Sequence, residues 1–205
     1  MKKFVNLPLN KFISELSLKT AAPGGGSTSA AAAAMGISLL SMAANFSVNK
    51  TGDEKNNTEI VKIITKLSEY QTDALALVDL DAEMYGLVAK ALKLPKNNQG
   101  EINIRNRRLQ SALMNSLSVP VSVFEISCNV IPYAERLVKI GNKNLISDVY
   151  CGLSMLKAAI ETSEFNMDAN IKYISDSKFK NNFSKKYVTA VKKSVTRIGK
   201  IINNL

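Results

Sequence analysis

The sequence predicts an all-α protein, a bundle of long helices that forms a single domain over residues 1–205. Three observations support this prediction. No segment alternates apolar and polar residues over the length of a strand, and no Asn-Gly or Asp-Gly hairpin turn occurs. Long stretches instead repeat apolar residues at helical spacing. With 205 residues, of which 46% are hydrophobic and 21% charged, the chain can bury one well-formed core.

Loops and turns divide the chain into its expected helices. Pro8 lies at or near the first turn of a short helix, and Pro95 ends the helix expected at residues 58–94. Pro120 and Pro132 are expected to kink or break a helix, and Ser147 is expected to cap the next. The expected helices are residues 8–18, 27–46, 58–94, 101–137, one that begins at 147, 165–175 and 182–202.

Residues 20–47, TAAPGGGSTSAAAAAMGISLLSMAANFS, stand out by composition. No charged residue occurs from Thr28 to Val48, which is close to the length of a membrane span. Most of these residues are Ala and Ser, with Asn45 among them, and strong basic flanks are missing, so lipid would gain little from the segment. A helix with small residues on every side fits better in the middle of a bundle. We therefore expect no membrane partner.

Gly24, Gly25 and Gly26 follow Pro23 directly before this helix. Glycines can take backbone angles that are closed to other residues, so their N–H groups can turn toward one point at the helix N-terminus. The partial positive charge there suits a carboxylate or a phosphate, and Ser27 or the residue after it can cap the helix. The run matches neither the P-loop nor the dinucleotide fingerprint. A tight turn that only lets two helices pack explains the glycines equally well.

A second informative feature is a carboxylate on an apolar helix face. Asp81 lies in the middle of that face, and Asp79 lies close to it but off its centre. Burying a carboxylate is costly unless it is paired or neutral, and such groups often have raised pKa values and take part in catalysis. A buried ion pair with a lysine or arginine is the alternative. The face consists of Ala74, Leu77, Val78, Asp81, Met84, Tyr85 and Val88.

The net charge of +10, with 27 Lys and Arg against 17 Asp and Glu, favours anionic partners. Basic residues are densest in residues 177–200, where apolar residues recur at helical spacing, so we interpret this segment as a surface helix with a lysine face. It shows no aromatic stacking platform, and we expect no nucleic-acid partner. Cys128 and Cys151 lack metal-ligand spacing, so we expect no metal site. Two lone thiols suggest a reducing compartment, so we expect a cytoplasmic location.

The sequence offers few other catalytic groups. It contains no histidine, and neither cysteine has a visible activating partner, so in an enzyme the protons would move through Asp, Glu, Lys, Tyr or water. The stretch GNKNLISD, residues 141–148, ends in Ser147 and Asp148 at a helix start, where ordinary capping explains both residues.

Several stretches together resemble the cyclodeaminase/cyclohydrolase family that acts on tetrahydrofolate derivatives. They occur in the family's order and cover almost the whole chain. The sequence departs from the family in NKTGDEKNN, residues 49–57, where a Gly-Lys-Lys-type stretch is common, and at Asp168, where the family tends to be apolar or basic. The stretches that carry the resemblance are residues 20–47, LVDLDAEMYGLVAKALKLPK (77–96), RRLQSALMNSLSVPVSV (107–123), GNKNLISD (141–148) and NMDANIKYISD (166–176).

The resemblance implies an all-helical homodimer that takes a folate, expected to be polyglutamylated, as its substrate and needs no metal or redox cofactor. One reaction of the family hydrolyses 5,10-methenyltetrahydrofolate to the 10-formyl form. The other closes 5-formiminotetrahydrofolate to the methenyl form and releases ammonia. Both pass through a tetrahedral carbon between two nitrogens. We expect the hydrolase, with the deaminase and an inactive helical scaffold of the same fold as alternatives.

The resemblance also implies the residues of the site. A partly buried carboxylate can accept a proton and face the cationic amidinium of the substrate, which makes Asp81 the leading base or charge stabiliser. Basic side chains would attract the glutamate tail. The expected catalytic residues are Asp81, Asp79 and Asp148, and the expected substrate-binding residues are Gly24, Gly25, Gly26, Ser27, Lys172, Arg107 and Asn166.

Overall fold

The computed structural model describes residues 3–50 and 52–203. Within these residues the chain forms α-helices and two short 3-10 helices and no strand, which confirms the all-α class. The elements in order are η1 (Phe4–Asn6), α1 (Leu9–Leu16), α2 (Gly25–Asn45), α3 (Glu54–Leu92), α4 (Gln99–Ile140), η2 (Lys143–Leu145), α5 (Ile146–Ile171) and α6 (Ser177–Asn203).

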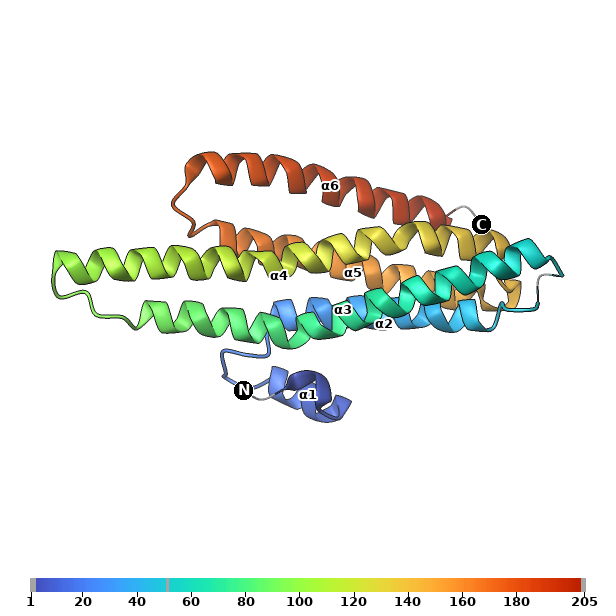
Figure 1. Ribbon diagram of the computed structural model, residues 1–205, viewed down its shortest axis with the longest axis horizontal. Coiled ribbons are helices and arrows are strands. Elements are labelled where there is room, and N and C mark those ends of the chain that lie inside the picture. The colour runs from blue at the N-terminus through green and yellow to red at the C-terminus, as the bar shows by residue number, and fades with distance from the viewer. Residues whose placement is uncertain (1–2, 51, 204–205) are drawn as a thin grey trace.

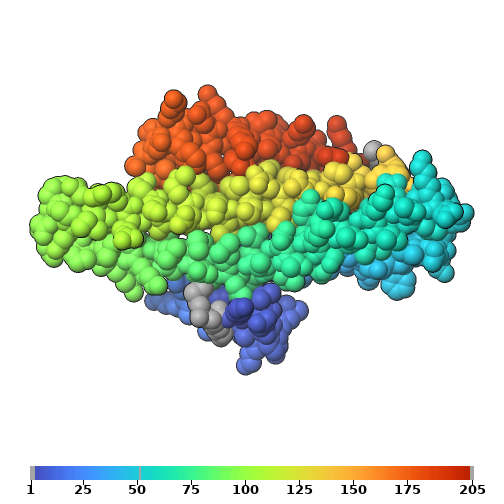
Figure 2. All heavy atoms as spheres, in the orientation of Figure 1, coloured from blue at the N-terminus to red at the C-terminus, as the bar shows by residue number. Residues whose placement is uncertain are grey.

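Helices α2 to α5 form the body of the bundle (Figure 1). Helix α2 packs between α3 and α5, and α4 packs against the same two helices. Helix α6 lies along the outside and packs mainly against α5, while α1 projects from the opposite side (Figures 1 and 2). The hairpin of α3 and α4 extends beyond the other helices at the end where its connecting turn lies.

Helix α2 is central because its side chains are small. Eleven of its 21 residues are buried, and they form a wide face of the helix, whereas Thr28 and Met35 on the other side are exposed. Gly36 of α2 and Gly152 of α5 let the two backbones approach closely: a Cβ atom added at Gly36 would lie 2.8 Å from the carbonyl oxygen of Gly152. Helices α2 and α4 each contain an apolar window long enough to cross a membrane, but half or more of each window is buried inside the bundle. We therefore interpret both as core helices.

The helix boundaries correct several expectations. Helix α4 runs through Pro120 and Pro132 without a break, because packing on both neighbours holds it. Residues 165–171 of the expected separate helix 165–175 are the last part of α5, which ends at Ile171, and α6 begins five residues before the expected position 182. The predicted cap at Ser147 is wrong: Leu145 precedes α5, with η2 directly before it, and Ser147 lies inside the first turn.

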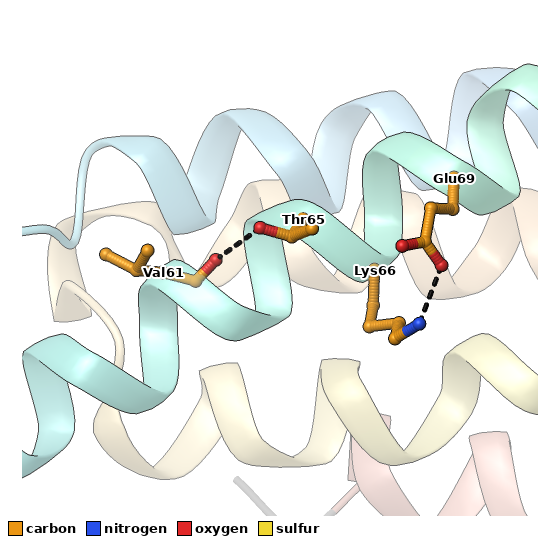
Figure 3. A network of polar contacts seen from close by, with 4 residues as sticks. All are labelled: Val61, Thr65, Lys66 and Glu69. Atoms are coloured by element: carbon orange, nitrogen blue, oxygen red, sulfur yellow. Dashed lines mark hydrogen bonds and ion pairs between the residues drawn. The ribbon is translucent and has the colours of Figure 1, made fainter.

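Surface pairs link and decorate the long helices. Arg136 of α4 donates two hydrogen bonds to Glu59 of α3, at 2.6 and 2.7 Å, and holds the pKa of Glu59 below its ordinary value. Figure 3 shows the exposed side of α3, where the Lys66 ammonium lies 2.7 Å from a Glu69 oxygen and the Thr65 hydroxyl donates to the Val61 carbonyl. Exposed pairs of this kind contribute little to the free energy of unfolding; the bundle is held by its buried apolar residues.

Candidate functional site

A cavity of about 580 Å³ lies where the N-terminus of α2 meets α3, α4 and the end of α5. Its size is typical of small-molecule sites. Most of its wall is apolar, and the polar groups come from three separate helices. The lining residues are Thr20, Ala21, Gly24, Gly25, Gly26, Asp81, Tyr85, Val88, Leu92, Leu109, Leu113, Ser116, Asn166, Ala169, Asn170 and Tyr173.

Asp81 is the acidic residue of the cavity wall, and its partner is a serine rather than a base. Its Oδ2 accepts hydrogen bonds from the Ser27 amide at 2.9 Å and from the Ser27 hydroxyl at 3.1 Å. No Lys or Arg in the described part of the chain pairs with it, so the alternative of a buried ion pair does not hold. Burial raises the pKa of Asp81 above its ordinary value, and the two Ser27 hydrogen bonds oppose that rise.

Gly25 and Gly26 serve close contact rather than unusual backbone angles, which corrects our expectation, whereas a Cβ atom at Gly24 would meet no atom within 4 Å. Gly24 is extended (φ −138°, ψ −157°) and precedes α2, whereas Gly25 and Gly26 already belong to the helix. A Cβ atom at Gly26 would lie 1.9 Å from the Asp81 Oδ1. The Asp81 carboxylate thus occupies the electropositive end of α2, where we had expected a ligand's anion.

Ser27 does not cap its own helix. Its hydroxyl reaches across to α3, where it donates to the Val78 carbonyl at 2.8 Å as well as to Asp81. The amides of Gly25 and Gly26 point to no acceptor among the described residues, since the first N–H groups of a helix have no partner within it. These two amides are therefore available to a ligand in the cavity.

Asn166 contributes the polar side of α5. Its side-chain amide donates to the Ser29 hydroxyl at 3.2 Å and to the Thr162 carbonyl at 2.9 Å. Its Oδ1 lies 3.0 Å from the place where a Cβ atom of Gly25 would be, so that glycine, too, is needed for close contact. Asn170, one turn further, donates to the Asn166 carbonyl at 2.8 Å and also lines the cavity.

Gln110 of α4 holds the loop that follows α5, and Tyr173 of this loop lines the cavity. Its side-chain amide donates to the Tyr173 carbonyl at 3.0 Å, and its Oε1 accepts from the Ser175 amide at 2.8 Å. Tyr173 is held against the cavity in this way. The ammonium of Lys172, which is exposed, lies 5.7 Å from the centre of the Tyr173 ring, so this predicted residue is next to a lining residue but does not itself line the cavity.

The structure separates the other two predicted carboxylates from Asp81. Asp79 lies on another side of α3, where its Oδ1 accepts hydrogen bonds from the Phe4 amide at 2.5 Å and from the Val5 amide at 3.3 Å and so anchors η1. Asp148 lies at the opposite end of α5 from Asn166, 18 residues or roughly 27 Å away along the helix. Neither residue lines the cavity: the Asp79 side chain contacts η1 on another side of α3, and Asp148 lies at the far end of α5.

The predicted Arg107 is exposed and does not line the cavity. The α4 residues that do line it are Leu109, Leu113 and Ser116, which follow one another by four and three positions. Arg105 precedes Leu109 by one turn on that face, and its Nε is buried without a partner among the described residues. The face could have been found in the sequence by this spacing, which points to Arg105 rather than Arg107.

The turn GNKNLISD ties the far end of the bundle together. The Asn142 amide donates to the Ser47 hydroxyl at 2.8 Å, which joins the α4–α5 turn to the end of α2. Its side-chain oxygen accepts from the Asn144 amide at 3.0 Å. Within the described residues no group of three Asp, Glu or Cys side chains could hold a metal ion.

Comparison with known proteins finds relatives that match most of this chain. The sequence profile of the formiminotransferase-cyclodeaminase family matches residues 8–189. Formimidoyltransferase-cyclodeaminase of Gallus gallus is 32% identical over 183 residues, which are 89% of this chain and 34% of that protein. The protein from Rattus norvegicus is 26% identical over 204 residues, and this chain spans 38% of its length.

Two further relatives are close to this chain in extent. Methenyltetrahydrofolate cyclohydrolase of Methylorubrum extorquens is 28% identical over 174 residues, 85% of this chain and 84% of that protein. The crystal structure of formiminotetrahydrofolate cyclodeaminase from Thermotoga maritima superposes with a TM-score of 0.82 at 29% identity and covers 96% of both chains. On the match over most of its length, this chain belongs to the formiminotransferase-cyclodeaminase family.

Proposed function

We propose that the protein hydrolyses 5,10-methenyltetrahydrofolate to 10-formyltetrahydrofolate in the cavity that contains Asp81. The observation that carries the proposal is a half-buried carboxylate without a basic partner, held by Ser27 on the wall of a largely apolar cavity. The family's folate relatives support the choice of substrate, and the relative of similar extent that is a cyclohydrolase supports the choice of reaction.

The geometry suits a cationic substrate. Tyr85, Leu113 and Tyr173 offer apolar and aromatic surface for a heterocyclic ring, and Asp81 offers negative charge to an amidinium. Ser27 fixes Oδ2 through two hydrogen bonds, while Oδ1 has no donor in the described protein. The carboxylate is therefore oriented and still has a free oxygen with which to accept a proton.

In the proposed reaction a water molecule attacks the carbon between the two nitrogens, and Asp81 Oδ1 accepts its proton. The carbon becomes tetrahedral, and its positive charge is lost. Asp81 then gives the proton to N5 as the bond between N5 and the carbon breaks, and the remaining hydroxyl proton leaves to solvent as the formyl group forms on N10. General acid–base catalysis of this kind contributes about a hundred- to ten-thousandfold in rate.

Basic residues beyond the cavity suit the acidic tail of a folate. Lys172 lies beside Tyr173, which lines the cavity, and Arg105 lies one helical turn from Leu109 on the side of the α3–α4 turn. We propose that these two residues attract the glutamate carboxylates of a polyglutamylated substrate. We also propose that the enzyme is a homodimer, as the resemblance implies.

The second candidate is ring closure of 5-formiminotetrahydrofolate with release of ammonia, which the Thermotoga maritima structure favours by its name and extent. One optical assay separates the candidates, because the methenyl compound absorbs in the near ultraviolet and the formyl compound does not. Loss of absorbance supports the hydrolase. Its appearance from the formimino compound, together with ammonia, supports the deaminase. No change with either substrate, and no folate binding, supports an inactive scaffold and overturns the proposal.

A further inference from the structure

Ser116 is a buried polar residue of the cavity whose hydroxyl has no partner in the described protein. It is 5% exposed and lines the cavity from α4. A serine inside a helix commonly donates to the carbonyl four residues earlier. Ser127, on the same helix and fully buried, does so to Val123 at 2.8 Å. Ser116 does not.

The contrast extends to every buried serine of the described chain. The other five donate to a carbonyl, at distances between 2.7 and 2.8 Å. The Ser116 oxygen is not one of the described polar atoms that are sealed in the protein without a partner, so it opens to the cavity that Ser116 lines, where the acceptor of a ligand can reach it. The five bonded serines are Ser27, Ser29, Ser47, Ser127 and Ser163.

A second observation concerns the backbone of the same residue. In an α-helix the carbonyl of Ser116 would accept from the amide of residue 120, but that residue is Pro120, which has no N–H. The helix therefore leaves the regular acceptor position at Ser116 unfilled. Ser116 thus has an unpartnered hydroxyl next to a carbonyl that its own helix cannot satisfy in the usual way.

Ser116 lies at the end of the cavity that is far from the α3–α4 turn, whereas the end near the turn is lined by Leu92 and Leu109. Helices α3 and α4 are joined by a short turn and run antiparallel, with Leu92 and Leu109 on the side of that turn. Moving away from it, the lining residues end at Asp81 on α3 and at Ser116 on α4. The two polar residues therefore mark the same end of the cavity from different helices.

We infer that the Ser116 hydroxyl binds the substrate, as donor to the 4-oxo oxygen of the pterin ring, and positions the bridge carbon against Asp81. The inference rests on the proposed function. The 4-oxo group is attached beside the ring carbon that carries N5, so it is the ring's polar atom nearest to the reacting bridge. A hydroxyl at the Asp81 end of the cavity can reach it while Asp81 faces the bridge.

The test measures folding and binding separately in Ser116→Ala. Thermal unfolding should be unchanged or shifted upward, because no protein hydrogen bond is lost and alanine favours a helix. The dissociation constant for tetrahydrofolate, measured by calorimetry, should rise about three- to tenfold, as expected for one hydrogen bond. The ratio kcat/KM for the methenyl substrate should fall by at least the same factor.

Two further variants sharpen the test. Ser127→Ala is the matched control, and it should bind tetrahydrofolate like the wild type because its hydroxyl is bonded to the helix. Ser116→Cys places a slightly larger and weakly donating group at the same position, so its dissociation constant should lie between those of wild type and Ser116→Ala.

A folded Ser116→Ala protein with unchanged binding and kcat/KM would overturn the inference and leave the proposed function intact. A wild-type protein that binds no tetrahydrofolate would overturn both. Equal loss of binding in Ser116→Ala and Ser127→Ala would mean that the packing of α4 matters rather than the hydroxyl, which also overturns the inference.

Discussion

The carboxylate of Asp81 occupies the space that any side chain at Gly26 would need. The two residues lie on different helices, and a Cβ atom at Gly26 would be 1.9 Å from the Asp81 Oδ1. Position 26 must therefore be glycine because Asp81 of α3 fills the space beside it. The Asp81 carboxylate can then contact the N-terminus of α2 directly.

Gly26→Ala should abolish most turnover, by about a hundredfold or more, because the new methyl group must push Asp81 away from Ser27. Steady-state kinetics with the methenyl substrate checks this. Gly86→Ala, on the same helix as Asp81 and with no atom within 4 Å of its Cβ position, is the control and should keep its activity and gain some stability. Equal activity in both variants would contradict the contact.

Asp81→Asn should lower turnover by at least about a hundredfold while the protein remains folded. The amide oxygen can still accept from Ser27, so the variant loses the charge and the base but keeps the shape. The control is Asp73→Asn, an exposed carboxylate on the same helix. Near-normal turnover in Asp81→Asn would remove Asp81 from the mechanism.

The raised pKa of Asp81 predicts how stability depends on pH. Between the ordinary value of 3.8 and the raised value, the folded protein retains a proton that the unfolded chain has lost, so the wild type becomes less stable as pH rises through this window. Asp81→Asn lacks this loss. Its Tm minus that of the wild type should be constant below the window, increase through it and be constant above. A difference that does not change with pH would contradict the shift.

Catalytic activity should increase with pH over the range in which Asp81 ionises, whereas the stability of the folded protein decreases there. As a base, Asp81 must be ionised, so kcat/KM should fall as pH falls through its raised pKa. A bound cationic bridge favours the carboxylate, so the corresponding inflection in kcat should lie at lower pH. Both profiles are obtained from the absorbance assay. An inflection that persists in Asp81→Asn would belong to another group.

Asp79 should prove structural although the sequence suggested a catalytic role. Asp79→Ala removes the acceptor for the amides of Phe4 and Val5, so their hydrogen exchange should quicken at least about tenfold while Tm changes little. Asp79→Asn keeps an acceptor and should retain both protection and turnover. A hundredfold loss of turnover in Asp79→Asn would return this residue to the reaction.

The sequence was most informative where one helix determines the outcome. The small-residue helix α2 packs inside the bundle as expected, although its Thr28 and Met35 side is exposed, and Asp81 lies among buried residues such as Ala74 and Val78. Tyr85, counted as part of that apolar face, is 45% exposed because the cavity lies beside it. A periodic pattern marks a face but does not say whether a neighbour or a cavity covers it.

The sequence was least informative where two helices must be placed together. The reason for Gly26 depends on the residue opposite it, and the distance of Asp148 from Asp81 depends on the direction of α5. The motif around Arg107 points to that residue, but the cavity face of α4 is formed by Leu109, Leu113 and Ser116. Ser116 could have been found as the polar member of that face.

The contact between Gly36 and Gly152 has a consequence for the site although it lies away from it. The two helices approach each other closely at this contact. On α2, Gly25 lies 11 residues, or roughly 16 Å, from Gly36, and on α5, Asn166 lies 14 residues, or roughly 21 Å, from Gly152. A methyl group at Gly36 or Gly152 would push α2 and α5 apart, and the distance between Gly25 and Asn166 would increase. The geometry of the candidate site is thus sensitive to substitution at two positions that do not line the cavity.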